Sequence, residues 1–166
     1  MPRSNCHPQV AAFLDLLAFS EGTKGKGDDG YNDIVDPAGF FDDYSTHPNV
    51  LVPVRANLKS TAAGRYQFLS RYWGHYRDQL DLPDFGPESQ DTWAIQLIRE
   101  QKALADVLDG RIQRIDDANR QDRRVVLGKP VVFARFQHVA AQQRAGRGIA
   151  TQLHTSVAVD GGQRRQ

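Results

Sequence analysis

The stretch AFLDLLAFSEGTKGKGDDG, residues 12–30, changes from an apolar helical pattern to a glycine-rich polar loop. The apolar positions of one helical face before the loop are Val10, Phe13, Leu14 and Leu17. Their i, i+3, i+4, i+7 spacing predicts a helix over about Val10 to Phe19. Glu21, one of three glutamates in the chain, lies four residues after Leu17 and extends the same face. We therefore expect the helix to point the Glu21 carboxyl toward the core.

A carboxyl group in this position suits proton transfer. Partial burial disfavours the charged form and can raise the pKa of a glutamate to roughly 6–7, so that it donates a proton near neutral pH. The glycines that end the helix behind it are Gly22, Gly25, Gly27 and Gly30. The alternative for Glu21 is a helix-terminal side chain that is merely solvated.

The remaining elements follow from periodicity. Turn-forming residues separate short β-favouring pieces at Tyr31–Val35 and Val50–Val54, which predicts a small antiparallel sheet. A third helix is expected from about Ser89 to Leu108, with Gly110 as its cap. The stripe of a second helix, between these two regions, consists of Leu69, Tyr72, Trp73, Tyr76 and Leu80. We interpret this aromatic stripe and Trp93 of the third helix as core.

Five segments in the same order resemble the lambda-type phage endolysins. They are AFLDLLAFSEGT (12–23), GYNDIV (30–35), FDDYSTHP (41–48), LKSTAAGRYQFLSRYW (58–73) and FGPESQD (85–91). The resemblance covers about Ala12 to Gln113. It implies an α+β, lysozyme-like fold, mainly helical with a small antiparallel β-sheet beside the catalytic groove. It also implies a lytic transglycosylase that cleaves peptidoglycan glycan strands and lyses the bacterial cell, with Glu21 of the SEGT motif as the catalytic acid.

By the same resemblance, the AGRYQ piece lines the groove opposite the acid. The substrate-binding candidates are Ser60, Thr61, Gly64, Arg65, Tyr66 and Gln67, with Tyr44 and His47 in second rank. Their polar groups surround small residues that let a polymer approach the backbone. Gln67 can hold a sugar amide or hydroxyl, and Tyr66 can pack against a pyranose ring. The alternative is a helix start at which Ser60 or Thr61 is the N-cap.

The reaction product depends on how many carboxylates take part. Hydrolysis with two carboxylates requires a second Asp or Glu at about 5–9.5 Å from the acid, whereas a lytic transglycosylase needs only one. We predict that Glu21 alone cleaves the bond between N-acetylmuramic acid and N-acetylglucosamine and gives a 1,6-anhydromuramoyl product. A hydrolytic lysozyme is the alternative, because four aspartates remain possible second carboxylates: Asp28, Asp29, Asp33 and Asp36. A non-catalytic peptidoglycan-binding protein is a further alternative.

Length and composition predict one compact domain. The chain has 166 residues, 40% of them hydrophobic, and no run of apolar residues long enough to span a membrane. It shows no signal-peptide pattern, and its single cysteine, Cys6, cannot form an internal disulfide, which fits a reducing cytoplasm. We expect a monomer that stays in the host cytoplasm until a separate pore protein releases it to the periplasm and cell wall. We expect no nucleic-acid partner and no membrane insertion.

No cofactor and no metal is predicted. GKGDDG (25–30) matches G-x-G-x-x-G, but a helix precedes it and a polar loop follows, so the strand and helix of a dinucleotide site are missing. The aspartates around it lack the EF-hand spacing, and the five histidines show no paired metal-ligand spacing.

The charge changes sign along the chain. Residues 1–110 carry 10 basic and 16 acidic side chains, a net of −6, whereas residues 111–166 carry 11 basic and 4 acidic, a net of +7. Tyr, Trp and Glu do not occur in the second part. We predict a lysozyme-like catalytic lobe over residues 1–113 and an atypical basic tail over residues 114–166. The tail is either a frame-shifted reading of the gene or a poorly packed extension; the alternative is a segment that binds anionic polymers.

Overall fold

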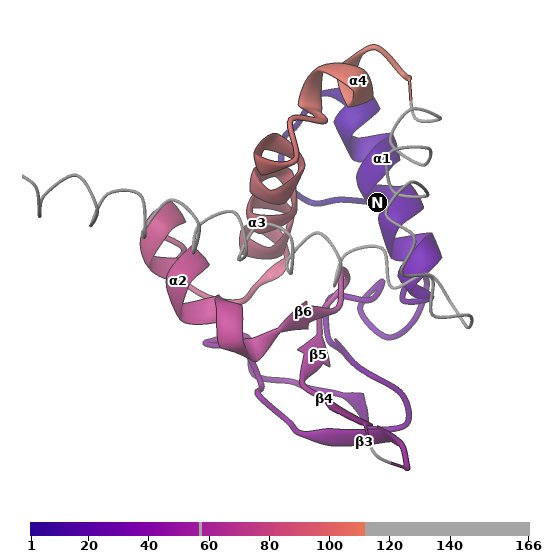
Figure 1. The fold of residues 1–166 in the computed structure, drawn as a ribbon, viewed down its shortest axis with the longest axis vertical. Coiled ribbons are helices and arrows are strands. Elements are labelled where there is room, and N and C mark those ends of the chain that lie inside the picture. The colour runs from indigo at the N-terminus through magenta and orange to yellow at the C-terminus, as the bar shows by residue number, and fades with distance from the viewer. Residues whose placement is uncertain (57, 112–166) are drawn as a thin grey trace, which may run out of the picture.

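The computed structural model describes residues 1–56 and 58–111. Its elements are α1 (Pro8–Glu21), β1 (Asp33–Ile34), β2 (Gly39–Phe40), β3 (Val52–Arg55), β4 (Leu58–Ser60), β5 (Ala62–Ala63), β6 (Phe68–Leu69), α2 (Ser70–Leu80), α3 (Pro87–Glu100) and α4 (Leu104–Leu108). Figure 1 shows α1 and α3 side by side with α4 across one end, the strands toward the other end, and α2 beside the sheet. The fold is α+β, as the sequence predicts.

Helix α1 is the helix predicted from the apolar spacing. Pro8 occupies its first turn, where no N–H is needed, and His7 Nδ1 accepts the Gln9 N–H at 3.2 Å. The predicted apolar face is buried, with each of its four residues at most 4% exposed. Gly22, with φ 74°, ends the helix, so Glu21 is its last residue.

The predicted third helix is two helices, α3 and α4, because the chain turns at Lys102. Lys102 has a φ of 58°, in the left-handed region, and the Ala103 N–H donates to Ile98 O in the last turn of α3 at 3.1 Å. This is the usual way in which a residue of left-handed conformation ends a helix. The turn changes the phase of the helical face. Ala105 and Leu108, in the last part of the predicted helix, are therefore exposed, and Ala103 and Val107 lie in the core.

The strands form two antiparallel sheets rather than one. The first has the order β2-β1-β5-β6, and the second is a hairpin of β3 and β4 that lies at the far end of the molecule from α4 (Figure 1). Residues 58–69 are thus mostly strand, and the alternative of a helix start at Ser60 or Thr61 is wrong. Thr61 still serves a helix, because its Oγ1 accepts the N–H of Ser70, the first residue of α2, at 3.2 Å.

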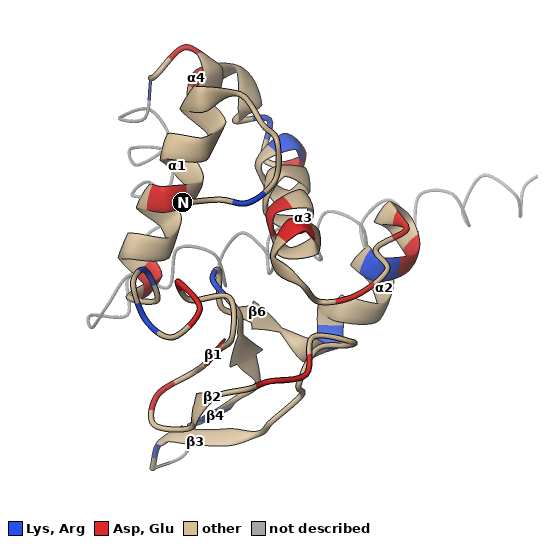
Figure 2. Cartoon of the chain, turned by 180° about the vertical axis from the view of Figure 1, so that it is seen from behind, with Lys and Arg blue, Asp and Glu red and all other residues tan. Residues whose placement is uncertain are grey.

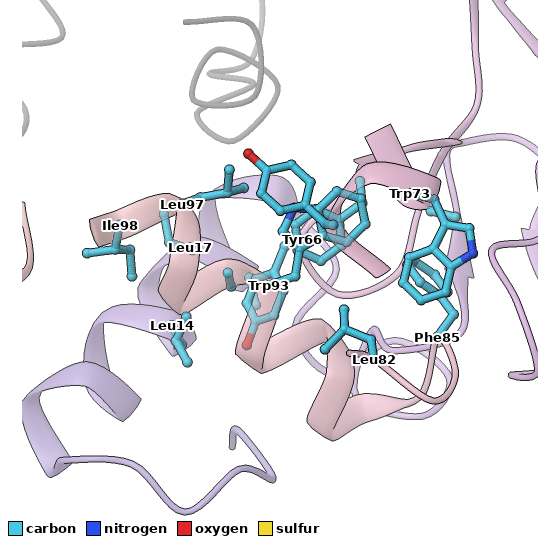
Figure 3. Close-up of a cluster of buried hydrophobic side chains, with 14 of the residues drawn as sticks. Leu14, Leu17, Tyr66, Trp73, Leu82, Phe85, Trp93, Leu97 and Ile98 are labelled. Carbon is cyan, nitrogen blue, oxygen red and sulfur yellow. The ribbon is translucent and has the colours of Figure 1, made fainter. Parts of the chain in front are cut away.

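Aromatic side chains form the centre of the core, and Figure 3 shows Trp73, Phe85 and Trp93 among them. Trp93 is fully buried and stacks on Phe68, with ring centroids 3.9 Å apart and 4° between the planes. Trp73 and Tyr76 of α2 lie 5.9 and 4.9 Å from the Trp93 ring. The structure therefore confirms Trp73, Tyr76 and Trp93 as core, and their large buried area holds the sheet against the helices. The other residues of the predicted stripe, Leu69, Tyr72 and Leu80, are only partly buried.

Two predictions from composition concern a membrane span and the basic tail. Within the two described ranges, no helix combines the length and hydrophobicity needed to cross a bilayer. The predicted basic tail, residues 114–166, lies outside the described residues.

Candidate active site at the end of helix α1

Glu21 lies where the helical lobe meets the four-stranded sheet. It is the last residue of α1, and it is partly exposed. Two residues further on, the buried Thr23 Oγ1 lies 3.1 Å from Ala18 O and 2.6 Å from Arg65 O. These hydrogen bonds fix the end of α1 to the turn between β5 and β6. The predicted acid and the AGRYQ segment are therefore neighbours in space.

The turn between β5 and β6 has a conformation that requires glycine. Gly64 has φ +76°, and a Cβ at this position would lie 2.8 Å from Gln90 Cδ. The Gln67 N–H closes the turn on Gly64 O at 3.0 Å, and the Gly64 N–H attaches it to β1 through Asp33 O at 2.8 Å. Gly64 is buried, so the missing side chain makes room for Gln90 rather than for the polymer that we predicted.

Arg65 and Tyr66 hold the turn from inside. The Arg65 side chain has no exposed surface, and its guanidinium forms ion pairs with Asp15 at 2.5 Å and Asp29 at 2.7 Å. Asp29 lies on the loop after α1, where Figure 2 shows basic and acidic segments next to each other. Tyr66 is equally buried and donates its hydroxyl to Asp91 Oδ1 at 2.5 Å. Neither side chain has exposed surface with which to contact a sugar. The prediction that Arg65 and Tyr66 bind the glycan directly is therefore wrong, and both residues stabilise the turn instead.

His47 is also part of the scaffold. Its Nδ1 accepts the Asn49 N–H at 3.0 Å, so the ring proton lies on Nε2, which donates to Phe68 O at 2.9 Å. Burial lowers the pKa of His47, and the ring is neutral at neutral pH. With 4% of its surface exposed, His47 cannot contact a glycan as predicted. Tyr44 is partly exposed and donates its hydroxyl to Asp28 at 2.8 Å.

Of the three remaining predicted binding residues in this segment, two are partly exposed and one is buried. Ser60 and Thr61 are partly exposed at the junction of β4 and β5. Gln67 is 7% exposed and donates its side-chain amide to Asp33 Oδ2 and to Gly64 O, both at 3.2 Å.

The four aspartates that the sequence left open as second carboxylates differ in their environments. Asp28 and Asp29 are held in ion pairs with arginines, and the Asp36 side chain is 74% exposed. Asp33 is 4% exposed, and this burial raises its pKa to about 6. In the part of the chain that the structure describes, no three His, Cys, Asp or Glu side chains come together as a metal site.

The sequence analysis assigned no role to several residues that build the site. Gln90 Oε1 accepts the Arg65 N–H at 2.9 Å, and its Nε2 donates to two backbone carbonyls. Asp91 accepts two tyrosine hydroxyls and two backbone N–H groups of the N-terminal segment. Thr23 joins α1 to the turn. The only signal for Gln90 and Asp91 was their place in the FGPESQD segment, because their partners lie far away in the sequence.

A helical lobe joined to small antiparallel sheets, with a glutamate at the junction, is the architecture of the lysozyme-like enzymes. The sequence model of the family described as Endolysin matches residues 11–122, beyond the end of the motif resemblance at Gln113. The chain belongs to the endolysin family, which consists of phage enzymes that degrade bacterial peptidoglycan.

Individual relatives agree with the family match. The endolysin of Escherichia phage P2 is 51% identical over 126 residues, which cover 69% of this chain and 76% of that protein. The endolysin of Escherichia phage lambda is 49% identical over 113 residues, 66% of this chain and 71% of its own. The solved structure of bacteriophage lambda lysozyme complexed with a chitohexasaccharide gives a TM-score of 0.60 at 49% identity, over 63% of this chain and 70% of that one.

Proposed function

We propose that Glu21 is the catalytic acid with which this endolysin cleaves glycan strands by intramolecular transglycosylation. The observation that carries the proposal is the position of Glu21. It is a partly exposed carboxyl at the end of a buried helix, and it is fixed by Thr23 next to a turn that bears polar side chains. Such a group is placed to transfer protons to and from a substrate bound at the surface.

The proposed reaction uses one carboxyl group twice. Glu21 donates its proton to the oxygen that links N-acetylmuramic acid to N-acetylglucosamine, and the C1–O bond breaks through an oxocarbenium-like transition state. The resulting carboxylate accepts the proton of the muramoyl C6 hydroxyl while that oxygen bonds to C1. Glu21 is thereby protonated again, the product ends in a 1,6-anhydro sugar, and no water is consumed.

The surrounding carboxylates support a reaction with a single acid. Asp28 and Asp29 are engaged in ion pairs, Asp36 is largely exposed, and Asp33 hydrogen-bonds to the Gln67 amide. A glycan substrate is supported by lambda lysozyme, whose structure contains a chitohexasaccharide.

For glycan contact we retain the partly exposed residues and Gln67, which is 7% exposed. These are Ser60, Thr61 and Gln67, with Tyr44 in second rank. We further propose that the protein acts on the cell wall after its release from the cytoplasm, and that it does so as a monomer.

The test compares Glu21→Gln with Glu88→Gln, an exposed glutamate on α3 that serves as the matched control. On purified peptidoglycan, Glu21→Gln is expected to lower the cleavage rate by about 10² to 10⁴, because the amide keeps the shape but cannot donate the proton. Glu88→Gln is expected to cleave normally, and both variants should unfold at the same urea concentration as the unmodified protein. Normal cleavage by Glu21→Gln would show that another group is the acid.

Mass spectrometry of the products separates the remaining alternatives. We expect muropeptides with anhydro, non-reducing muramoyl ends. Products heavier by one water and reducible by borohydride would identify a hydrolytic lysozyme. If the unmodified protein binds permeabilised Gram-negative cells without reducing their turbidity, it is a non-catalytic binding protein.

A further inference from the structure

Asp33 is a buried carboxyl group to which the proposed reaction assigns no step. It lies on β1 and is 4% exposed. Among the described residues, no lysine or arginine lies within ion-pair distance of it, although such a partner normally offsets the cost of burying a carboxylate. Its side-chain partner is the amide of Gln67, whose Nε2 lies 3.2 Å from Asp33 Oδ2.

The neighbours of the Gln67 amide fix its orientation. Nε2 faces Asp33 Oδ2 and the carbonyl oxygen of Gly64, both at 3.2 Å. A carboxylate and a backbone carbonyl only accept hydrogen bonds, so the amide nitrogen must face them and the amide oxygen must face away. Within the described ranges, no residue donates a hydrogen bond to that oxygen.

The backbone also holds Gln67 in place. Its φ of 51° lies in the left-handed region, which residues other than glycine rarely adopt. The turn that imposes this angle is attached to β1 by the Gly64 N–H, which donates to Asp33 O at 2.8 Å. Two residues before Gln67, Arg65 O is bonded to Thr23 at the end of α1. The unused amide oxygen is therefore carried by the same turn that is fixed beside Glu21.

We propose that Asp33 is a positioning residue for glycan cleavage. It holds the Gln67 amide so that the amide oxygen accepts a hydrogen bond from an acetamido N–H of the bound strand. The sugars of peptidoglycan carry such N–H groups, and a carbonyl oxygen without a protein donor is the matching acceptor. Asp33 itself does not touch the substrate. This inference rests on the proposed function.

The first test measures binding of a chitohexasaccharide by calorimetry in the Glu21→Gln protein, in which cleavage does not interfere. Asp33→Val suits a strand and removes the acceptor, and Gln67→Met keeps the length of the side chain and removes the amide. Each is expected to weaken binding roughly 10-fold, and the double variant no more than either single one, because both break the same contact. Asp33→Asn keeps an acceptor oxygen and should restore binding to within about 3-fold of the parent.

The second test uses proteins with Glu21 intact and soluble peptidoglycan strands. The losses are expected in KM rather than in kcat, because the proposed contact also forms in the ground state. Asp36→Asn removes an exposed carboxylate three residues away and should change neither constant. A residue that merely stabilises the fold would lower the folded fraction and the apparent kcat instead, without coupling to Gln67.

Two results would overturn the inference: a folded Asp33→Val variant that binds the chitohexasaccharide normally, or losses that add in the double variant. If Asp33→Val does not fold, Asp33→Ala takes its place in the same cycle, because it cannot overpack the site. Failure of the proposed function looks different. In that case the unmodified protein leaves peptidoglycan intact or Glu21→Gln still cleaves it, whereas overturning this inference leaves cleavage dependent on Glu21.

Discussion

The replacement Asp33→Asn should change how the stability of the protein depends on pH. Burial raises the pKa of Asp33 from 3.8 to about 6; Lys26 opposes this rise and Asp36 adds to it. Because the folded protein binds this proton more tightly than the unfolded chain, the stabilisation is complete below pH 3.8 and is lost as the pH rises through 6. With these two pKa values, the loss between pH 5 and pH 7.5 is about 1.4 kcal/mol. Asparagine does not titrate, so the variant lacks this loss.

The assay is urea unfolding at pH 5 and pH 7.5, followed by the fluorescence of the two buried tryptophans, Trp73 and Trp93. The free energy of unfolding of Asp33→Asn minus that of the unmodified protein is expected to rise by about 1.4 kcal/mol from the lower to the higher pH. Other titrating groups are common to both proteins and cancel. Asp36→Asn, at an exposed carboxylate, is the control and should show a much smaller change. The same difference at both pH values would refute the argument that Asp33 is buried without a compensating charge.

Three further predictions test the scaffold and the tail. Gly64→Ala should lower the free energy of unfolding by about 3 kcal/mol in urea titrations, because the new Cβ meets Gln90 and φ is +76°; a loss under 1 kcal/mol would contradict the tight turn. Tyr66→Phe removes one hydroxyl donor from Asp91 and should cost about 1.5–3 kcal/mol in the same assay, and an unchanged midpoint would show that the bond contributes nothing. Sequencing the gene should show an open second reading frame over residues 114–166, and stop codons in that frame would exclude a frame-shifted tail.

The elements that the sequence predicts well are those whose signal is local. The spacing of four apolar residues is enough to locate α1, because the helical period alone decides which side chains share a face. The aromatic stripe of α2 is predicted as core for the same reason. The end of α3 is not predicted from the sequence, because Lys102 carries no helix-breaking signal. Its φ of 58° depends on how Ala103 and Val107 pack against the other helices.

In the candidate site, too, the features with a local sequence signal are predicted and those that depend on distant residues are not. The position of Glu21 at the end of a helix is readable from the glycines that follow it. The burial of Arg65 and Tyr66 is not, because their partners Asp15 and Asp91 lie 50 and 25 residues away in the sequence. The polar AGRYQ segment, with its small residues, predicts a binding loop. In the folded protein, however, most of its polar groups form hydrogen bonds within the protein.

Arg65 explains why a turn with so little exposed surface can still matter for the reaction. Its guanidinium binds Asp15 in the middle of α1, and its carbonyl oxygen binds Thr23 just after the end of that helix. One residue of the turn is thus attached to α1 at two points on either side of Glu21. These two contacts, both buried or nearly so, restrain the position of the turn relative to the end of α1 that carries Glu21. Since an acid must be held in position relative to the bonds that it protonates, this double attachment makes the buried AGRYQ segment part of the proposed catalytic geometry even where it touches no sugar.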